Sequence, residues 1–122
     1  MLLALDTATP AVTVAVADGE DVLAQRCTID PRRHGELLAP AISEVLAAAE
    51  VQPRHLTEIA VGVGPGPFTG LRVGLVTART LGAVLGIPVT GVCTHDHLAL
   101  AAWLAGISGT FRVVTDARRK EV

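Results

Sequence analysis

A glycine-rich turn between an apolar run and a helical pattern is the part of the chain best suited to ligand binding. It reads GVGPGPFTGLRVG over residues 62–74. A turn that follows a strand and opens a helix aims backbone N–H groups outward, so Gly64, Gly66 and Thr69 are candidates for an anion or nucleotide loop. However, no Lys-Ser/Thr pair follows the last glycine, and two prolines remove N–H donors. A purely structural tight turn is an equally good interpretation, and we assign no catalytic step to it.

A second candidate is the short polar segment Asp6-Thr7-Ala8-Thr9, which follows the first apolar run. Sugar kinases, actin and the heat-shock ATPases have an acid-glycine-threonine loop around phosphate and metal at this point. Here Ala8 stands where a glycine would let the backbone approach the phosphates. We therefore expect Asp6 to hydrogen-bond nearby N–H groups rather than to serve as a metal ligand or base.

The histidines do not form a metal-binding pattern. His95 and His97 flank Asp96 at the expected start of a helix, where side chains two residues apart point in different directions. His34 and His55 lie in expected loops, and no HxxxH or HExxH pair exists. We interpret the histidines as surface or capping residues and predict neither a metal site nor catalytic residues.

Composition limits the classes of function. The chain has 122 residues, half of them hydrophobic, 2% aromatic residues and a net charge of -2. Few stacking platforms and no basic field argue against autonomous binding of nucleic acid. Cys27 and Cys93 are too few for a disulfide framework and are expected to be buried thiols. The longest apolar stretch, residues 98–105, is far below the ~20 residues of a membrane span. We expect a cytoplasmic protein with no membrane partner.

The elements that position these segments follow from periodicity. Strands are expected at residues 2–5, 11–17, 21–28, 59–63 and 89–93, and helices at 34–50, 69–85 and 94–105. Asp18-Gly19 predicts a hairpin turn, so the chain opens with a β-meander. The order βββαβαβα predicts an α/β fold with a mixed sheet, matching a ribonuclease-H-like lobe.

Both major helices have more apolar surface than one sheet can cover. On the second helix, small residues recur every four positions and leave a groove for another helix. Packing on its own sheet or on the first helix is at least as good an explanation for each residue. Taking both helices together, we predict an intermolecular interface, at which Gly74→Arg or Gly82→Arg would abolish pairing without unfolding the lobe. The predicted interface residues are Leu38, Ile42, Val45, Gly70, Leu71, Gly74, Ala78 and Gly82.

The end of the chain repeats the pattern of its start. Residues 111–115 form an apolar run that ends in Asp116, as residues 2–5 end in Asp6. A repeat offset by the length of one lobe suggests a duplicated two-lobe architecture. We predict an amino-terminal lobe over residues 1–109, with residues 110–122 as the first strand of a truncated second lobe.

Three segments together resemble the TsaB (YeaZ) family of tRNA threonylcarbamoyladenosine biosynthesis proteins: LLALDTATPAVTVAV, GVGPGPFTGLRVG and VVTDARRKEV. The resemblance covers the whole chain. It implies a non-catalytic member of the actin-like ATPase superfold that pairs with its paralogue TsaD. TsaD carries the metal and transfers threonylcarbamoyl to N6 of the adenosine beside the anticodon.

The resemblance also implies partners and cofactors. A TsaE-like ATPase is an expected partner, tRNA is contacted only through the complex, and a homodimer forms through the same helices when TsaD is absent. The lobe alone is expected to bind no cofactor, and ATP or ADP would be held, if anywhere, at an interface of the complex. Pro67 departs from the usual serine of the family loop and removes a hydroxyl and an N–H.

Two alternative functions belong to other classes. An ATP-dependent phosphotransferase of the actin and sugar-kinase superfold would need the glycine that Ala8 replaces. An M22-type metallopeptidase would need an HxxxH pair, which the sequence lacks. Nucleotide turnover by the purified chain would indicate the phosphotransferase, and bound metal would indicate the metallopeptidase.

Overall fold

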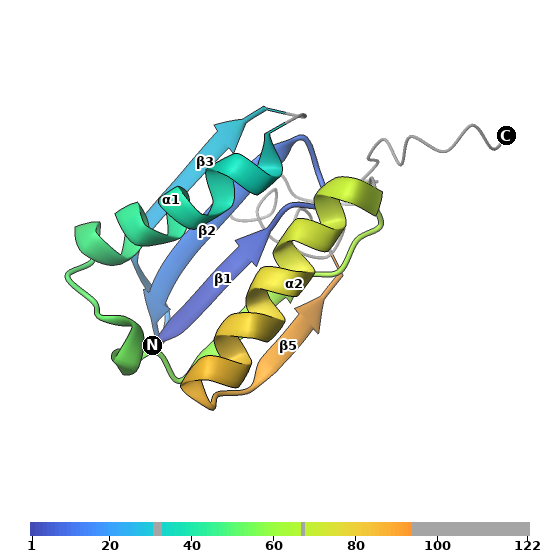
Figure 1. The fold of residues 1–122 in the computed structure, drawn as a ribbon. Coiled ribbons are helices and arrows are strands. Elements are labelled where there is room, and N and C mark those ends of the chain that lie inside the picture. Colours follow the sequence, from blue (N-terminus) through green and yellow to red (C-terminus); the bar gives the residue numbers. More distant parts are fainter. Residues whose placement is uncertain (31–32, 67, 94–122) are drawn as a thin grey trace, which may run out of the picture.

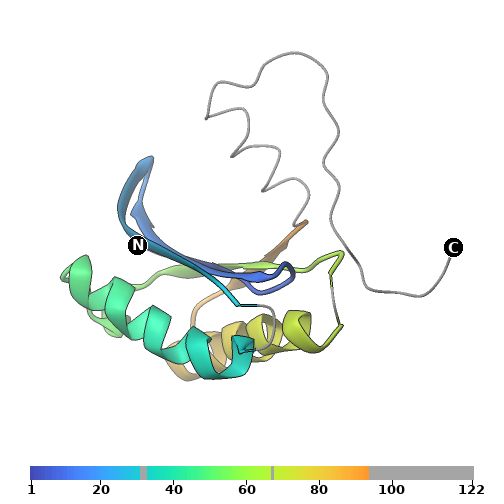
Figure 2. The ribbon, with the colours of Figure 1, turned by 90° about the horizontal axis from the view of Figure 1, so that it is seen from above.

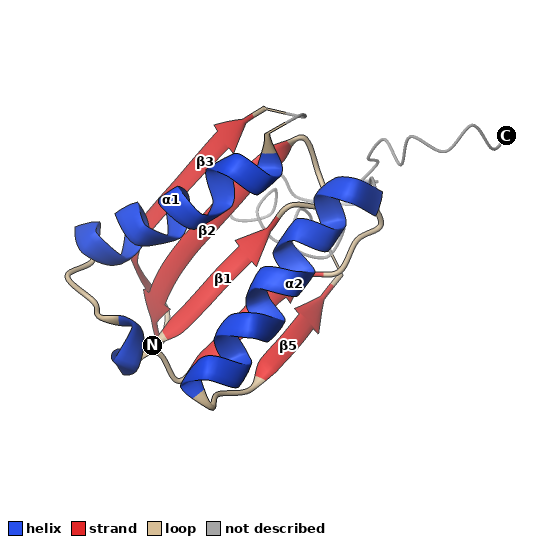
Figure 3. Cartoon of the chain, in the orientation of Figure 1, coloured by secondary structure: helices blue, strands red, loops and turns tan. Residues whose placement is uncertain are grey.

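The described part of the chain folds into one five-stranded sheet with two long helices (Figures 1 and 3). This computed structural model describes residues 1–30, 33–66 and 68–93, without the side chains of Phe68 and Thr69. The elements are β1 (Leu2–Asp6), β2 (Ala11–Asp18), β3 (Asp21–Ile29), α1 (His34–Ala48), the 3-10 helix η1 (Pro53–His55), β4 (Glu58–Gly62), α2 (Phe68–Leu85) and β5 (Val89–Val92).

The strand order β3-β2-β1-β4-β5 makes the sheet mixed. β1 and β2, and β2 and β3, pair antiparallel, whereas β4 pairs parallel with both β1 and β5. Figure 2 shows α1 and α2 side by side on one face of the sheet. The expected α/β fold with a mixed sheet is confirmed, and the final expected helix lies outside the described residues.

Alternation along the strands builds the core between the sheet and the helices. Val12, Val14 and Val16 of β2 are fully buried, whereas Thr13 and Ala15 between them are half-buried on the other face. Rows across the sheet continue this pattern, because Leu3 is opposite Val16 on one side and Ile59 on the other. The helices and the loop after α1 complete the core with Leu38, Ala41, Ile42, Val45, Leu46, Val51, Leu56 and Ala78.

The observed elements begin and end within a few residues of the expected ones, with three differences. Residues 53–55 form η1, although only a helix end was expected there. His34 opens α1, where the predicted helix begins, but it is buried and not a surface residue. Cys27 is exposed because β3 is an edge strand, so the prediction of a buried thiol there is wrong.

Several predictions concern residues outside the described part of the chain. They are the helix over residues 94–105, the His95-Asp96-His97 segment, the strand over residues 111–115, and the boundary between residues 109 and 110. Within the described ranges, no helix is long and apolar enough to cross a membrane.

Candidate functional site

The loop after β1 and the start of α2 come together at one edge of the sheet. The Asp6 side chain is 5% exposed, and its Oδ1 accepts the backbone N–H of Ala8 at 2.7 Å. This contact confirms the expectation that Asp6 holds its own loop. Gly62 of β4 lies directly beside the carboxylate, where a Cβ atom would overlap it. A glycine is therefore required next to Asp6.

Thr7 joins this loop to α2 through its hydroxyl. The Oγ1 atom donates to the carbonyl of Gly70 and accepts the N–H of Gly74 at 2.9 Å. The threonine thus contacts two backbone groups four residues apart, one helical turn along α2. A Cβ atom at Gly74 would lie 2.7 Å from the same oxygen, so only glycine allows this approach. Thr7 is 1% exposed and acts as a structural pin.

The glycine-rich turn packs against the first loop. Gly64 has a φ of 96°, a conformation that favours glycine. A Cβ atom at Gly66 would overlap the carbonyl oxygen of Ala8. That oxygen is a hydrogen-bond acceptor, which disfavours a phosphate at this point. These contacts give Gly64 and Gly66 structural roles, and an anion site that includes Thr69 stays a prediction.

Two histidines have structural partners. The Nε2 atom of His34 lies 2.8 Å from the carbonyl oxygen of Thr9, so Nε2–H donates to it. The Nδ1 atom of His55 accepts the N–H of Gln52 and caps η1. Among the residues that the structure describes, no group of three or more His, Cys, Asp or Glu side chains could hold a metal ion.

The residues predicted to form the interface lie mostly inside the lobe. Leu38, Ile42 and Val45 belong to the core. Leu71 is half-buried, and Leu71 side-chain atoms lie next to Gly64. The remaining four, which we call the inner row, face the sheet and its loops. They are Gly70, Gly74, Ala78 and Gly82.

Close packing explains why the inner row is small. A Cβ atom at Gly70 would be 2.9 Å from the carbonyl oxygen of Thr7, and one at Gly82 would overlap the side chain of Val89. Ala78 is fully buried. The groove predicted for another molecule is thus filled by this lobe itself, and Gly74→Arg would unfold the lobe. Any partner surface on the two helices must consist of other residues.

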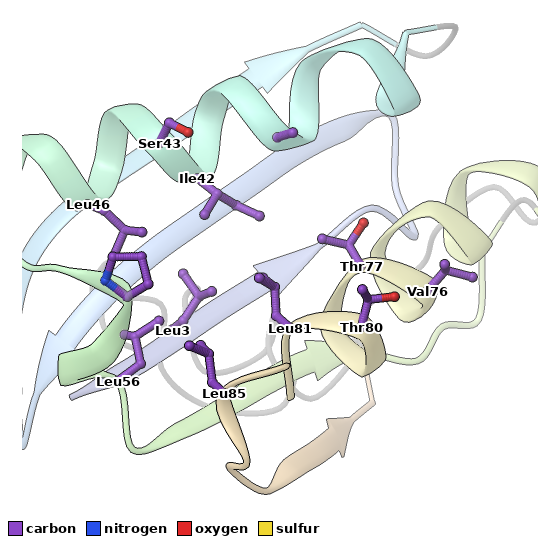
Figure 4. Close-up of a pocket in the computed structure, with 12 residues that line it drawn as sticks. Leu3, Ile42, Ser43, Leu46, Leu56, Val76, Thr77, Thr80, Leu81 and Leu85 are labelled. Atoms are coloured by element: carbon purple, nitrogen blue, oxygen red, sulfur yellow. The ribbon is translucent and has the colours of Figure 1, made fainter. Parts of the chain in front are cut away.

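An apolar groove lies between α1 and α2 (Figure 4). It has a volume of about 420 Å³. Ile42 and Leu46 of α1 and Leu81 and Leu85 of α2 point into the space above Leu3 of β1. The lining is completed by Ala39, Ser43, Pro53, Leu56, Val76, Thr77 and Thr80.

The residues that line this groove are all uncharged. On α1, Ala39, Ser43 and Ala47 are exposed at intervals of four residues, and we call them the outer row. On α2, Val76 is 55% exposed and Val84 76%, and Thr80 lies between them. We call the outer row together with Val76, Thr80 and Val84 the helix face. Periodicity in the sequence could have revealed these rows, but gave no sign of which row faces outward.

Comparison with known proteins shows which families the sequence resembles. Residues 23–122 match the sequence model of the family described as TsaD, tRNA N6-adenosine threonylcarbamoyltransferase. A Mycobacterium leprae protein is 48% identical over 126 residues, covering 100% of this chain and 34% of the relative. The tRNA threonylcarbamoyladenosine biosynthesis protein TsaB of Bacillus subtilis is 32% identical over 121 residues, covering 99% of this chain and 52% of that protein.

Solved structures agree with these matches. YeaZ from Pseudomonas aeruginosa superimposes with a TM-score of 0.80 at 36% identity, covering 84% of this chain and 48% of that one. The present chain thus spans about half the length of the TsaB and YeaZ proteins named here.

Proposed function

This chain belongs to the TsaB (YeaZ) family, and from that membership we propose that it is a non-catalytic accessory subunit in threonylcarbamoyladenosine formation on tRNA. In this proposal the lobe pairs with a TsaD-like paralogue through the helix face. The TsaD-like partner carries out the transfer of threonylcarbamoyl to the adenosine beside the anticodon.

The non-catalytic role is supported by the loop after β1. In a nucleotide-binding lobe of this superfold, the loop must leave room for phosphate oxygens and offer them N–H donors. Here Gly66 packs against the Ala8 carbonyl, and the Ala8 N–H is already bonded to Asp6. The loop is closed by contacts within the lobe. We therefore expect no turnover of nucleotide by this chain.

The observation that carries the pairing proposal is the apolar groove within the uncharged helix face. Charged residues are usually depleted at the centre of an interface and kept at its rim. The exposed charges lie beside this face: Arg72 and Arg79 lie to one side of Val76 on α2, and Glu44 bonds to Arg26 on β3. Glu36, in the first turn of α1, is paired with Arg33. The small side chains of the outer row would let a partner helix approach closely.

A pair of helices on the partner is the structure that would fit this groove. Ridges of one helix pack between the side chains of another, and the space between α1 and α2 could take apolar side chains from such a ridge. A TsaD-like paralogue of the same superfold would supply it, and a second copy of this chain would occupy the face when that paralogue is absent. TsaE-like ATPase and tRNA would join through the complex.

The experiment is a comparison of two Ala→Arg variants on α1. Ala39 lines the groove, whereas Ala48 is exposed but is not among the lining residues. The two are nine residues apart, which is half a turn out of phase, so they lie on opposite sides of the helix. Light scattering of each variant mixed with the TsaD protein of the same organism measures the complex.

We expect Ala39→Arg to weaken the complex by about tenfold or more, because an arginine would enter the groove without a partner for its charge. Ala48→Arg should bind as the unchanged chain does. Equal binding by both variants would contradict pairing through the helix face. Nucleotide turnover or peptide hydrolysis by the purified chain would contradict the accessory role itself and favour the phosphotransferase or metallopeptidase alternative.

A further inference from the structure

The two helices beside the groove carry exposed charges of opposite sign. α1 contains the acids Glu36 and Glu44 and no lysine or arginine. α2 contains Arg72 and Arg79 and no acid. A molecule that covers both helices therefore meets negative charge on α1 and positive charge on α2.

These charges differ in whether they already have a counter-ion. Glu44 is paired with Arg26 of β3, and Glu36 is paired with Arg33 at the start of α1. Arg79 is exposed and forms no ion pair within residues 1–30, 33–66 and 68–93. The acids of α1 are thus already neutralised, whereas the charge of Arg79 has no counter-ion in this part of the chain.

Arg79 lies beside the groove and does not line it. Each residue of an α-helix is turned by about 100° from the last, so Arg79 is about 60° from Val76 and about 160° from Leu81. Val76 is 55% exposed on the helix face, and Leu81 points into the groove (Figure 4). Arg79 therefore lies at the edge of the helix face, on the side of α2 that is turned away from α1.

The nearest positions to Arg79 on the surface of α2 are apolar. Leu75 and Ala83 are four residues before and after it, and Val76 is three residues before it. A partner seated on Val76 and Ala83 would remove part of the water around the guanidinium. Losing this water without a replacement costs free energy, and a carboxylate replaces it well because it accepts two parallel N–H bonds from arginine.

A carboxylate suits this position better than a phosphate of nucleic acid. Binding to a phosphate backbone depends on neutralising many phosphates, and the whole chain has a net charge of -2. The acids Glu36 and Glu44 also lie on the neighbouring helix, where they would repel a polyanion laid across both helices. An apolar centre with a few charges at its edge is instead the usual composition of an interface between proteins.

We propose that Arg79 pairs with an Asp or Glu side chain of the TsaD-like partner at the edge of their interface. This inference rests on the proposed function and adds to it the chemistry of one partner residue. Because the acids of α1 are neutralised within this chain, the partner needs no matching cation over α1. One charge pair on one side of the groove also distinguishes the two directions in which a helix pair could cover it.

The first test is charge reversal at Arg79. Surface plasmon resonance with immobilised TsaD of the same organism measures association and dissociation separately. Arg79→Glu should bind about tenfold more weakly at low salt, mainly through slower association, and the difference should shrink at high salt. Arg54→Glu changes the net charge equally, at an exposed residue of η1 that does not line the groove, and should change binding by less than about twofold.

The second test is carbodiimide coupling, which detects the carboxylate directly. Lys120 is the only lysine of the chain, so Arg79→Lys combined with Lys120→Arg leaves one side-chain amine, at position 79. The carbodiimide activates a carboxylate of TsaD, and the amine attacks it. An amide forms, and the water lost overall converts the carbodiimide to a urea. Mass spectrometry should find this amide between position 79 and an Asp or Glu of TsaD, and Lys120→Arg alone gives the background.

The outcomes separate this inference from the proposed function. If Ala39→Arg weakens the complex but Arg79→Glu does not, the helix face pairs with TsaD and the inference about Arg79 is wrong. If neither variant weakens it, both proposals are wrong. No amide at position 79 in a complex that forms would also overturn the inference. So would a variant that binds TsaD normally but weakens binding of tRNA to the complex, because Arg79 would then face nucleic acid.

Folding of each variant is checked by circular dichroism. Arg79 is exposed, so its replacement should change stability by no more than about 0.5 kcal/mol. Arg79→Gln removes the charge without reversing it and serves as a second variant if Arg79→Glu does not fold. It should weaken binding less than charge reversal does, with the same dependence on salt. Binding equal to that of the unchanged chain at low salt would contradict the charge pair.

Discussion

The inner row on α2 and the outer row on α1 have nearly the same sequence pattern and opposite environments. Both place small residues at intervals of four along a helix. The inner row is buried against Thr7 and Val89, where Cβ atoms on its glycines would be too close. The outer row is exposed beside the apolar groove. A row of small residues on a helix therefore indicates that another segment packs closely against it. Only the rest of the fold shows whether that segment belongs to the same lobe or to another molecule.

Among the substitutions that test this difference between the two rows, Gly74→Arg is expected to lower the stability of the chain most. Its Cβ atom would be 2.7 Å from the Thr7 oxygen and its side chain would point into the core. We expect the variant to lose at least about 3 kcal/mol of stability or to fail to fold. Urea unfolding followed by circular dichroism measures this. A native unfolding curve would show that the inner row can open toward solvent.

Thr7→Val should have the next largest effect. The substitution keeps the shape of the side chain but removes the hydroxyl that bonds to Gly70 and Gly74. We expect a loss of about 1–3 kcal/mol, because buried backbone groups lose a partner. Thr7→Ser, which keeps the hydroxyl, is the control and should lose less stability. If both variants unfold alike, the methyl group matters more than the hydrogen bonds.

Ser43→Arg probes the outer row. Ser43 is exposed on α1 at the groove, so an arginine there has room in the isolated chain. Stability should stay within about 0.5 kcal/mol of the unchanged chain, as for most surface substitutions. Binding to a TsaD-like partner should nevertheless weaken. A thermal melt and a binding titration of one preparation separate these effects, and a destabilised chain would show that the outer row is also structural.

Glu44→Gln should have the smallest effect. Glu44 pairs with Arg26 of β3, and each side chain is 51% exposed. Exposed pairs contribute about 0–1 kcal/mol, so the loss should be small and should shrink further as salt is added. Denaturation at low and high ionic strength checks this. A large, salt-independent loss would mean that the contact between β3 and α1 depends on this pair.

Much of the fold could be predicted from the sequence because its signals are local. The alternating valines of β2 mark the buried face of a strand, and Asp18-Gly19 marks the turn that follows it. The hydrogen bond from Ala8 to Asp6 was also expected, because it joins residues two apart. Each of these features needs only its near neighbours in the chain.

The remaining features depend on residues far apart in sequence. His34 is buried because its ring meets the carbonyl of Thr9, 25 residues earlier. The inner row faces the sheet because Thr7 contacts Gly74, 67 residues later. Hydrophobic periodicity describes a helix as a cylinder and carries no information on contacts of this kind. The α2 residues predicted to meet a partner therefore face the sheet and its loops instead of being exposed.

The Thr7 hydroxyl has a consequence for the orientation of α2 about its own axis. Glycine and alanine alone would leave a helix some freedom to turn or slide on a sheet, which Val73, Leu75, Leu81 and Leu85 of α2 reduce by packing against the core. Two hydrogen bonds from one oxygen to Gly70 and Gly74 remove this freedom, because only one azimuth and one axial position satisfy both. The direction in which Val76 and Val84 point is thereby determined from the opposite side of the helix.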